Sequence, residues 1–212
     1  MSKRSNDFDR IAPFYDILAK LVFGNAMKKA QTAFLDKIPS NSKVLIIGGG
    51  TGWILVELFE RLSNVQVVYV ESSAEMLSLT NSRLMKAWQA KVKFIHGNQC
   101  DIEQDHFDVI ITHFFLDLFK EDKVSHIINT LKATLKPNGK WLFCDFELNN
   151  VHSKYWQKIL VRTMINFFKL TTNLEANKLI DLREHLKSCG LKQVESRRFY
   201  KKMIVSCIFE PQ

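Results

Sequence analysis

Short apolar runs alternate with longer amphipathic stretches along most of the 212-residue chain. The apolar runs have the length and the β-branched content of strands that are buried on both faces, as in a parallel sheet. We expect five such strands at residues 44–47, 66–70, 92–95, 107–112 and 141–146, and two more at 191–199 and 203–209.

The stretches between the early strands have helical spacing. One apolar stripe follows the first strand and contains Ile54, Leu55, Leu58, Phe59 and Leu62. A second helix is expected at 122–135, and Pro137-Asn138-Gly139 then predicts a turn into the fifth strand. Regular alternation of strand and helix is typical of a doubly wound parallel sheet.

The last two predicted strands are separated only by residues 200–202, which is close enough for a hairpin and would add one antiparallel strand. We therefore predict an α/β fold with a Rossmann-like, doubly wound, seven-stranded sheet. The sheet is mostly parallel, with one antiparallel strand near the C-terminus and helices on both faces. A single domain spanning residues 1–212 accounts for this pattern.

The first strand leads into a glycine-dense turn, Gly48-Gly49-Gly50-Thr51-Gly52, which opens a helix. Glycine permits backbone angles closed to other residues and lets N–H groups approach a ligand. The spacing is not the G-x-G-x-x-G of dinucleotide sites, because Trp53 stands near the last glycine position. It is not a phosphate loop either, because no lysine follows the glycines. The turn therefore predicts another nucleotide-like ligand.

The second strand ends at Glu71-Ser72-Ser73. A carboxylate at the carboxyl end of a strand in an open α/β sheet faces the ligand crevice and can accept both hydroxyls of a ribose. The alternative is that Glu71 is a solvated strand end, with Ser73 serving only as a helix cap. Together with the glycine turn, Glu71 favours an adenosine ligand.

These motifs resemble those of class I S-adenosylmethionine (SAM)-dependent methyltransferases, and the predicted topology is similar to theirs. The resemblance implies that SAM is the cofactor and that the chain is a methyltransferase. The cofactor-binding residues that it implies are Gly48, Gly49, Gly50 and Gly52 in the turn, Glu71 at the ribose with Ser72 after it, Met76, Asn98 and Gln99 at the adenine, and Thr112 on the fourth strand.

The fourth strand continues into His113, beside the place where the reactive methyl group would be presented. With a reference pKa near 6.5, His113 could act as a general base or orient the acceptor. It could also lie hydrogen-bonded beneath the cofactor without a chemical role. After the third strand, Asn98 takes the position of the family's usual aspartate, and its amide can still pair with the adenine edge.

Two segments lie outside the predicted sheet. The first is residues 1–40, where the stretch Asp7-Phe8-Asp9-Arg10-Ile11-Ala12-Pro13-Phe14-Tyr15-Asp16 resembles the opening of the ubiquinone and menaquinone biosynthesis methyltransferases. The resemblance implies a helical cap whose Tyr15 contacts the cofactor or acceptor. Ordinary core packing would also explain Tyr15. Residues 151–170 form a broad aromatic helix face, which fits a lid over an apolar acceptor, a core helix or a homodimer interface.

The net charge of +8 is concentrated late in the chain, where residues 151–212 hold 12 Lys and Arg against 5 Asp and Glu. Such a face can be a solvated surface, a docking area for an acidic acceptor or a footprint on nucleic acid. Nucleic acid is disfavoured, because no Asn/Asp-Pro-Pro-Tyr/Phe tetrapeptide follows the fourth strand and no aromatic-basic interleaving occurs.

The four cysteines are far apart and form no C-x-x-C pair, so we expect no disulfide framework and no metal site. A reducing cytoplasm is the expected location. The sequence shows no signal peptide, and no apolar stretch is long enough to span a membrane.

One departure from the methyltransferase pattern leaves alternatives open, because Ile46 stands where the family has an acidic residue. The run also resembles aminopropyltransferases, which use decarboxylated SAM, although a polyamine pocket needs several carboxylates and the fourth strand end offers only Asp117. A catalytically silent SAM-binding module that docks a partner is a third interpretation, and an RNA methyltransferase is a minor one. The main expectation is methyl transfer to an apolar or acidic small molecule.

Overall fold

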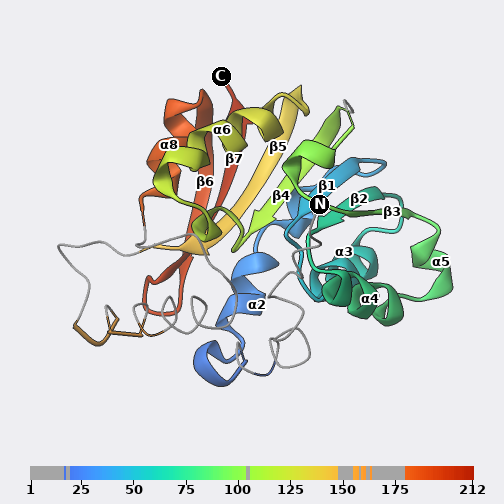
Figure 1. Ribbon diagram of the computed structural model, residues 1–212, viewed down its shortest axis with the longest axis horizontal. Helices are drawn as coiled ribbons and strands as arrows, with labels where there is room; N and C mark the ends of the chain where they lie inside the picture. The colour runs from blue at the N-terminus through green and yellow to red at the C-terminus, as the bar shows by residue number, and fades with distance from the viewer. Residues whose placement is uncertain are drawn as a thin grey trace, which may run out of the picture.

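The computed structural model describes residues 17, 20–103, 106–147, 155–157, 159–160, 163 and 180–212. Its strands are β1 (Lys43–Ile47), β2 (Gln66–Glu71), β3 (Val92–His96), β4 (Phe107–His113), β5 (Leu135–Phe146), β6 (Leu191–Phe199) and β7 (Ile204–Pro211). They form one seven-stranded sheet with the order β3-β2-β1-β4-β5-β7-β6 (Figure 1). Strand β7 runs antiparallel to both β5 and β6, and the pairs from β3 to β5 are parallel. The predicted fold is therefore confirmed.

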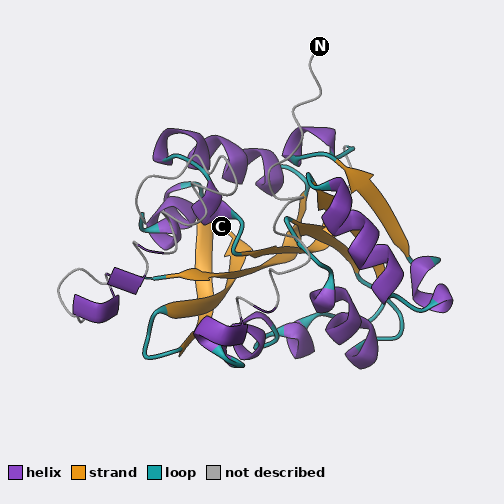
Figure 2. Cartoon of the chain, turned by 60° about the horizontal axis from the view of Figure 1, so that its bottom comes forward, coloured by secondary structure: helices purple, strands orange, loops and turns teal. Residues whose placement is uncertain are grey.

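Helices cover both faces of the sheet, as Figure 2 shows. The helices are α2 (Ala26–Gln31), α3 (Trp53–Arg61), α4 (Ala74–Arg83), α5 (Lys86–Gln89), α6 (Glu121–Lys132) and α8 (Leu182–Ser188), with 3-10 turns η2 (Leu35–Lys37), η3 (Gln99–Asp101) and η4 (Leu116–Leu118). Alternate residues of β1 enter opposite cores: Val44 and Ile46 pack with α3, whereas Leu45 and Ile47 pack with α6. This alternation explains why β1 is apolar throughout.

The fifth strand departs from the prediction. Helix α6 ends at Lys132 rather than at residue 135, and Leu135 already belongs to β5. Pro137-Asn138-Gly139 lies inside β5, so the predicted turn is wrong. The register shifts there, because Phe107 pairs with Leu135 and Val109 with Lys140. The extra residues form an irregularity of the ladder, which is where Pro and Gly are tolerated within strands.

The early part of the chain packs on the C-terminal hairpin. The Ser206 hydroxyl donates a hydrogen bond to the Ala30 carbonyl (2.7 Å), and the Tyr200 hydroxyl donates one to Val22 (2.9 Å). Helix α2 also reaches the first residue of α3, since the Lys28 ammonium lies 5.1 Å from the centroid of the Trp53 ring. The described part of the predicted cap thus extends from the hairpin to the glycine turn.

Two predictions fall largely outside the described residues. Tyr15 is not described, and neither is most of the 151–170 segment. Within that segment, Tyr155 and Ile159 are exposed, while Leu160 packs against the cluster that contains Phe23 and Met27. No helix in the described part of the chain is long and apolar enough to cross a membrane.

Candidate functional site

The glycine turn and the end of β2 are joined by a single carboxylate. Glu71 is only 7% exposed, and its two oxygens accept hydrogen bonds from the backbone N–H groups of Gly50 and Ser73, both at 3.0 Å. Burial raises its pKa above the usual value, even though these donors oppose the rise. Glu71 therefore fixes the turn against the next helix and keeps further acceptor positions on both oxygens.

The four glycines of the turn serve different purposes. A Cβ on Gly49 would meet the Tyr69 ring, and one on Gly52 would meet Thr80, so these two allow close packing. Gly48 would meet Phe115 in the same way. At Gly50 the one described residue near such a Cβ is Met76, whose sulfur would lie 3.6 Å away. Gly50 is therefore the position where the backbone is open to a ligand.

Sequence reasoning missed the two side chains that support this turn. The hydroxyls of Tyr69 and Thr80 both donate hydrogen bonds to the Gly50 carbonyl, at 2.9 and 3.0 Å. Tyr69 is buried in β2 beside Ile46 of β1. The sequence signal for this contact was a tyrosine within an otherwise aliphatic strand, because a buried hydroxyl requires a hydrogen-bond partner.

Met76 and Ser72 lie beside Glu71. Ser73 caps α4 by accepting a hydrogen bond from the Met76 N–H at 3.1 Å, which confirms its expected capping role. Met76 is 3% exposed, and the Ser72 hydroxyl lies 3.4 Å from a Glu71 oxygen. The structure therefore brings both residues to the turn.

The loop after β3 reaches the same place, because the Gly97 N–H donates a hydrogen bond to the Glu71 carbonyl (3.0 Å). Asn98 caps η3 by accepting a bond from Cys100, so part of its amide is occupied. Gln99 has a buried side-chain oxygen without a hydrogen-bond partner among the described residues. Gln99 thus has a buried polar atom that no other described residue uses.

The two predicted site residues on β4 differ in their hydrogen bonding. Thr112 is fully buried, and its hydroxyl accepts a hydrogen bond from the Trp141 indole at 2.7 Å, so its side chain is used inside the fold. His113 ends the strand, and its buried Nδ1 has no hydrogen-bond partner in the described part of the chain. Burial lowers its pKa to about 3, which differs from the expected value near 6.5. The imidazole is therefore neutral and only weakly basic at physiological pH.

Two acidic side chains lie next to these residues. Asp145 on β5 is 0% exposed, and Asp117 lies in η4 after β4. Each has one buried carboxylate oxygen to which no described residue donates a hydrogen bond. Asp145 was missed as a candidate, although it is the one charged residue in the apolar run 141–146.

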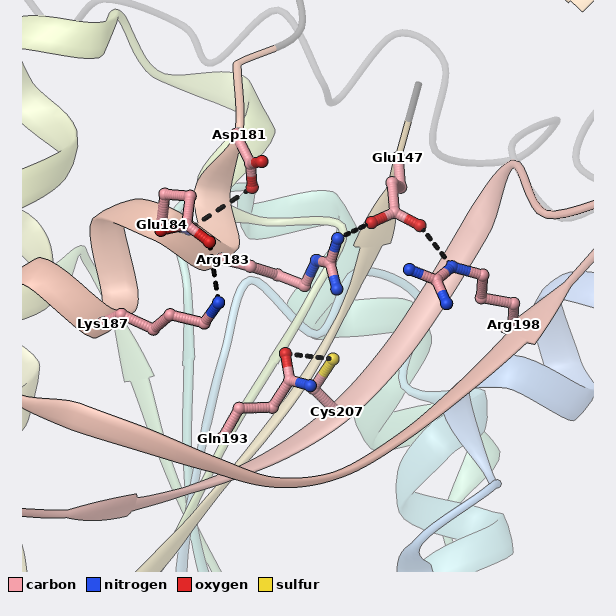
Figure 3. Close-up of polar contacts among 8 residues, drawn as sticks. All are labelled: Glu147, Asp181, Arg183, Glu184, Lys187, Gln193, Arg198 and Cys207. Carbon is pink, nitrogen blue, oxygen red and sulfur yellow. Dashed lines mark hydrogen bonds and ion pairs between the residues drawn. The ribbon is translucent and has the colours of Figure 1, made fainter. Parts of the chain in front are cut away.

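Further along the same edge, Glu147 lies between two arginines (Figure 3). One oxygen pairs with Arg183 of α8, and the other accepts a bond from Arg198 Nε of β6 at 2.7 Å. Glu147 and Arg183 are mostly buried, with side-chain exposures of 16% and 20%. Two guanidinium groups facing one carboxylate leave a net positive charge at this position.

Glu147→Gln is expected to destabilise the fold, because Arg183 and Arg198 would then face each other without a counter-charge. Hydrogen bonds to charged groups contribute about 1.5–3 kcal/mol each, and solvent screens the more exposed Arg198. We expect a loss of about 2 kcal/mol, or roughly 4–8 °C in Tm, measured by thermal denaturation. Glu184→Gln, which removes an exposed pair with Lys187, is the matched control and should leave Tm unchanged. Equal Tm values for the two variants would contradict the argument.

Comparison with known proteins gives one family. Residues 44–139 match the methyltransferase domain family. The chain is 26% identical over 150 residues to a carboxy-S-adenosyl-L-methionine synthase of Wolinella succinogenes, covering 68% of this chain and 62% of that protein. It is 24% identical to O-methyltransferase 12 of Dictyostelium discoideum, covering 89% of this chain and 52% of that protein. The chain thus spans less than two thirds of either relative.

Solved structures share the fold. A putative methyltransferase in complex with the Trm112 activator of Haloferax volcanii superposes with a TM-score of 0.73 at 16% identity, covering 99% of both chains. An O-methyltransferase family 2 protein of Planctomyces limnophilus, in complex with apigenin, also gives 0.73 at 16% identity, covering 100% of this chain and 62% of that one. At such identities the likeness establishes the architecture.

Proposed function

Because this chain belongs to the class I SAM-dependent methyltransferase family, we propose that it transfers a methyl group from SAM to a small-molecule acceptor. The observation that carries the proposal is the glycine turn, which Glu71 holds at the carboxyl edge of β1 and β2. Ligands of open α/β sheets bind at this edge.

The residues around the turn fit an adenosine-containing cofactor. Gly50 is open to a ligand on the side where a Cβ would stand. Glu71 has acceptor positions left for the two ribose hydroxyls. The buried Met76 offers an apolar surface for the adenine, and the unpaired oxygen of Gln99 can accept a hydrogen bond from the adenine amino group. In this proposal Gly48 and Gly49 adjoin the methionine end.

SAM supplies a methyl group on a sulfonium cation, which transfers by in-line displacement. The task of the chain is to align the acceptor with that methyl group, and alignment contributes roughly 7–11 kcal/mol in favourable cases. The neutral His113 fits the role of orienting an acceptor by hydrogen bonding better than that of a general base. The proposal therefore assigns most of the catalysis to positioning.

An acidic acceptor is supported by the arginines at the same edge. Within the described residues, Arg183 has a buried Nε without a hydrogen-bond partner, and Arg198 donates to Glu147 through its Nε. The guanidinium geometry suits carboxylates and phosphates. Among the relatives is a malonyl-[acyl-carrier protein] O-methyltransferase of Halalkalibacterium halodurans, 30% identical over 111 residues, 49% of this chain and 38% of that protein. We therefore propose carboxylated small molecules as the first acceptors to screen.

Isothermal titration calorimetry with SAM, S-adenosylhomocysteine and decarboxylated SAM tests the cofactor before an acceptor is known. We expect micromolar binding of the first two and weaker binding of the third. Preference for decarboxylated SAM would instead favour aminopropyl transfer. Binding of SAM without turnover of any acceptor would favour a silent module that docks a partner, and absence of binding would refute the proposal.

A further inference from the structure

SAM carries a positively charged α-ammonium group, so its binding site needs an acidic or hydrogen-bond-accepting partner for that group. Strand β1 provides no carboxylate, because Ile46 stands where the family has an acidic residue. The Ile46 side chain is 1% exposed and packs in the core with α3. Glu71 is engaged with the turn and is assigned to the ribose. The partner must therefore come from another element at the carboxyl edge of the sheet.

Asp117 and Asp145 lie at that edge. Strand β5 is paired with β4 so that Cys144 stands opposite His113, which puts Asp145 one residue beyond the end of β4. Asp117 follows β4 in η4. Two residues before it, the Phe115 ring lies where a Cβ on Gly48 would be. The loop that carries Asp117 is thus packed directly against the glycine turn.

The two carboxyl groups lack a counter-charge. Within the described residues they have the only buried carboxylate oxygens without a hydrogen-bond partner, and neither belongs to an ion pair. The Asp145 Oδ1 accepts the Phe146 N–H at 2.8 Å, which leaves its Oδ2 free. Leaving a buried charged group unpaired is costly, so an incoming cation would be stabilised here.

Burial favours the protonated form of both carboxyl groups. Burial raises the pKa of Asp117 to about 6, and burial together with the Asp117 charge raises the pKa of Asp145 well above its ordinary value. The titratable neighbours are neutral: burial raises the pKa of Cys144 well above its usual value and that of Cys207 to about 12, and it keeps His113 unprotonated. The shifts of Asp117 and Asp145 both favour a pair that retains a proton.

We propose that Asp117 and Asp145 together form the binding site for the α-ammonium group of SAM, replacing a carboxylate that the chain lacks at Ile46. The inference rests on the proposed function, because it concerns the same cofactor. A cation beside the pair favours the second ionisation, so ligand binding must expel the remaining proton to solvent. Affinity should consequently rise with pH through the range in which the pair still holds this proton.

Calorimetry of the full chain at about pH 7, in two buffers with different ionisation enthalpies, measures the proton released per ligand. The wild type is titrated with SAM and with S-adenosylhomocysteine, which both carry the ammonium group. We expect a release approaching one proton for each ligand. In Asp117→Asn the release should fall, because the Asp117 charge contributes to the raised pKa of Asp145, and both ligands should bind about tenfold to hundredfold more weakly.

The matched control is Asp108→Asn. Asp108 lies near the opposite end of β4, where it pairs with Lys136 and accepts the Lys43 N–H, so this variant makes the same charge change far from the turn. It should release the same proton as the wild type. Burial also raises the pKa of Glu71, but Glu71 is unchanged in all of these variants. The difference in proton release between the variants therefore reports on Asp117 and Asp145. Asp145→Asn repeats the test where its melting curve shows a folded protein.

Three results would overturn the inference while leaving the proposed function intact. They are binding of SAM without proton release, release and affinity in Asp117→Asn equal to those of the wild type, and release with SAM alone, which would place the sulfonium rather than the ammonium at the pair. If neither ligand binds the wild type, the proposed function fails as well.

Discussion

Glu71→Ala is expected to weaken SAM binding by about a hundredfold. The change removes the proposed acceptor of both ribose hydroxyls, and charge-assisted hydrogen bonds contribute about 1.5–3 kcal/mol each. A loss of about 3 kcal/mol corresponds to roughly two orders of magnitude in Kd. It also frees the Gly50 N–H, which the carboxylate holds at 3.0 Å. Calorimetric titration with SAM measures the effect.

Two further variants make this test specific. Glu75→Ala removes an exposed carboxylate from the first turn of α4, four residues away, and should leave SAM affinity unchanged. Glu71→Gln keeps the shape of the side chain without its charge and should fall between the wild type and Glu71→Ala. Full SAM affinity in a folded Glu71→Ala protein would show that Glu71 does not bind the ribose.

Gly52→Ala is expected to lower the stability of the fold and to abolish SAM binding. Gly52 has φ +74°, and its Cβ would collide with the Thr80 side chain, which donates a hydrogen bond to the Gly50 carbonyl. The left-handed backbone costs roughly 1–2 kcal/mol for alanine, and overpacking adds typically 1–3 kcal/mol. Tm should fall by roughly 5–15 °C, measured by thermal denaturation alongside SAM titration.

Gly24→Ala separates the two contributions. Gly24 also has a positive φ, +56°, but no described residue lies within 4 Å of its Cβ position, so only the backbone cost applies. The double variant Gly52→Ala/Thr80→Ser removes the methyl group that the new Cβ would strike and should recover part of the stability. If Gly52→Ala lowers Tm no more than Gly24→Ala does, the close approach to Thr80 does not contribute to the loss of stability.

The sheet could be predicted from the sequence because its pattern is local. Residues 44–47 are apolar on both faces, and only residues 200–202 separate the last two strands, so parallel order and one antiparallel strand both follow. The turn at Pro137 was wrong because the same residue types mark turns and ladder irregularities. Only the pairing of Phe107 with Leu135 distinguishes the two, and that pairing is tertiary.

The candidate site could be predicted from the sequence only where the residues that interact belong to the same motif or to adjacent strand ends. The glycine turn and Glu71 could be proposed as neighbours from adjacent strand ends. The pKa of His113 depends on burial by distant segments, so sequence alone returns its reference value. Likewise, Glu147 meets Arg183 and Arg198, which lie 36 and 51 residues away on different elements. No local periodicity encodes such pairs.

The packing of α2 on the C-terminal hairpin has a consequence for the order of folding during synthesis. Hydrogen bonds from Ser206 to Ala30 and from Tyr200 to Val22 span 176 and 178 residues. At translation rates of about 5–20 residues per second, the early helix waits roughly 10–30 s for its partner strands. During that time its apolar face has no native surface to cover it. Because this docking joins residues far apart in the sequence, it is a late and slow step of folding. The nascent chain, in which the apolar face of the helix is still uncovered, is therefore the state most exposed to aggregation.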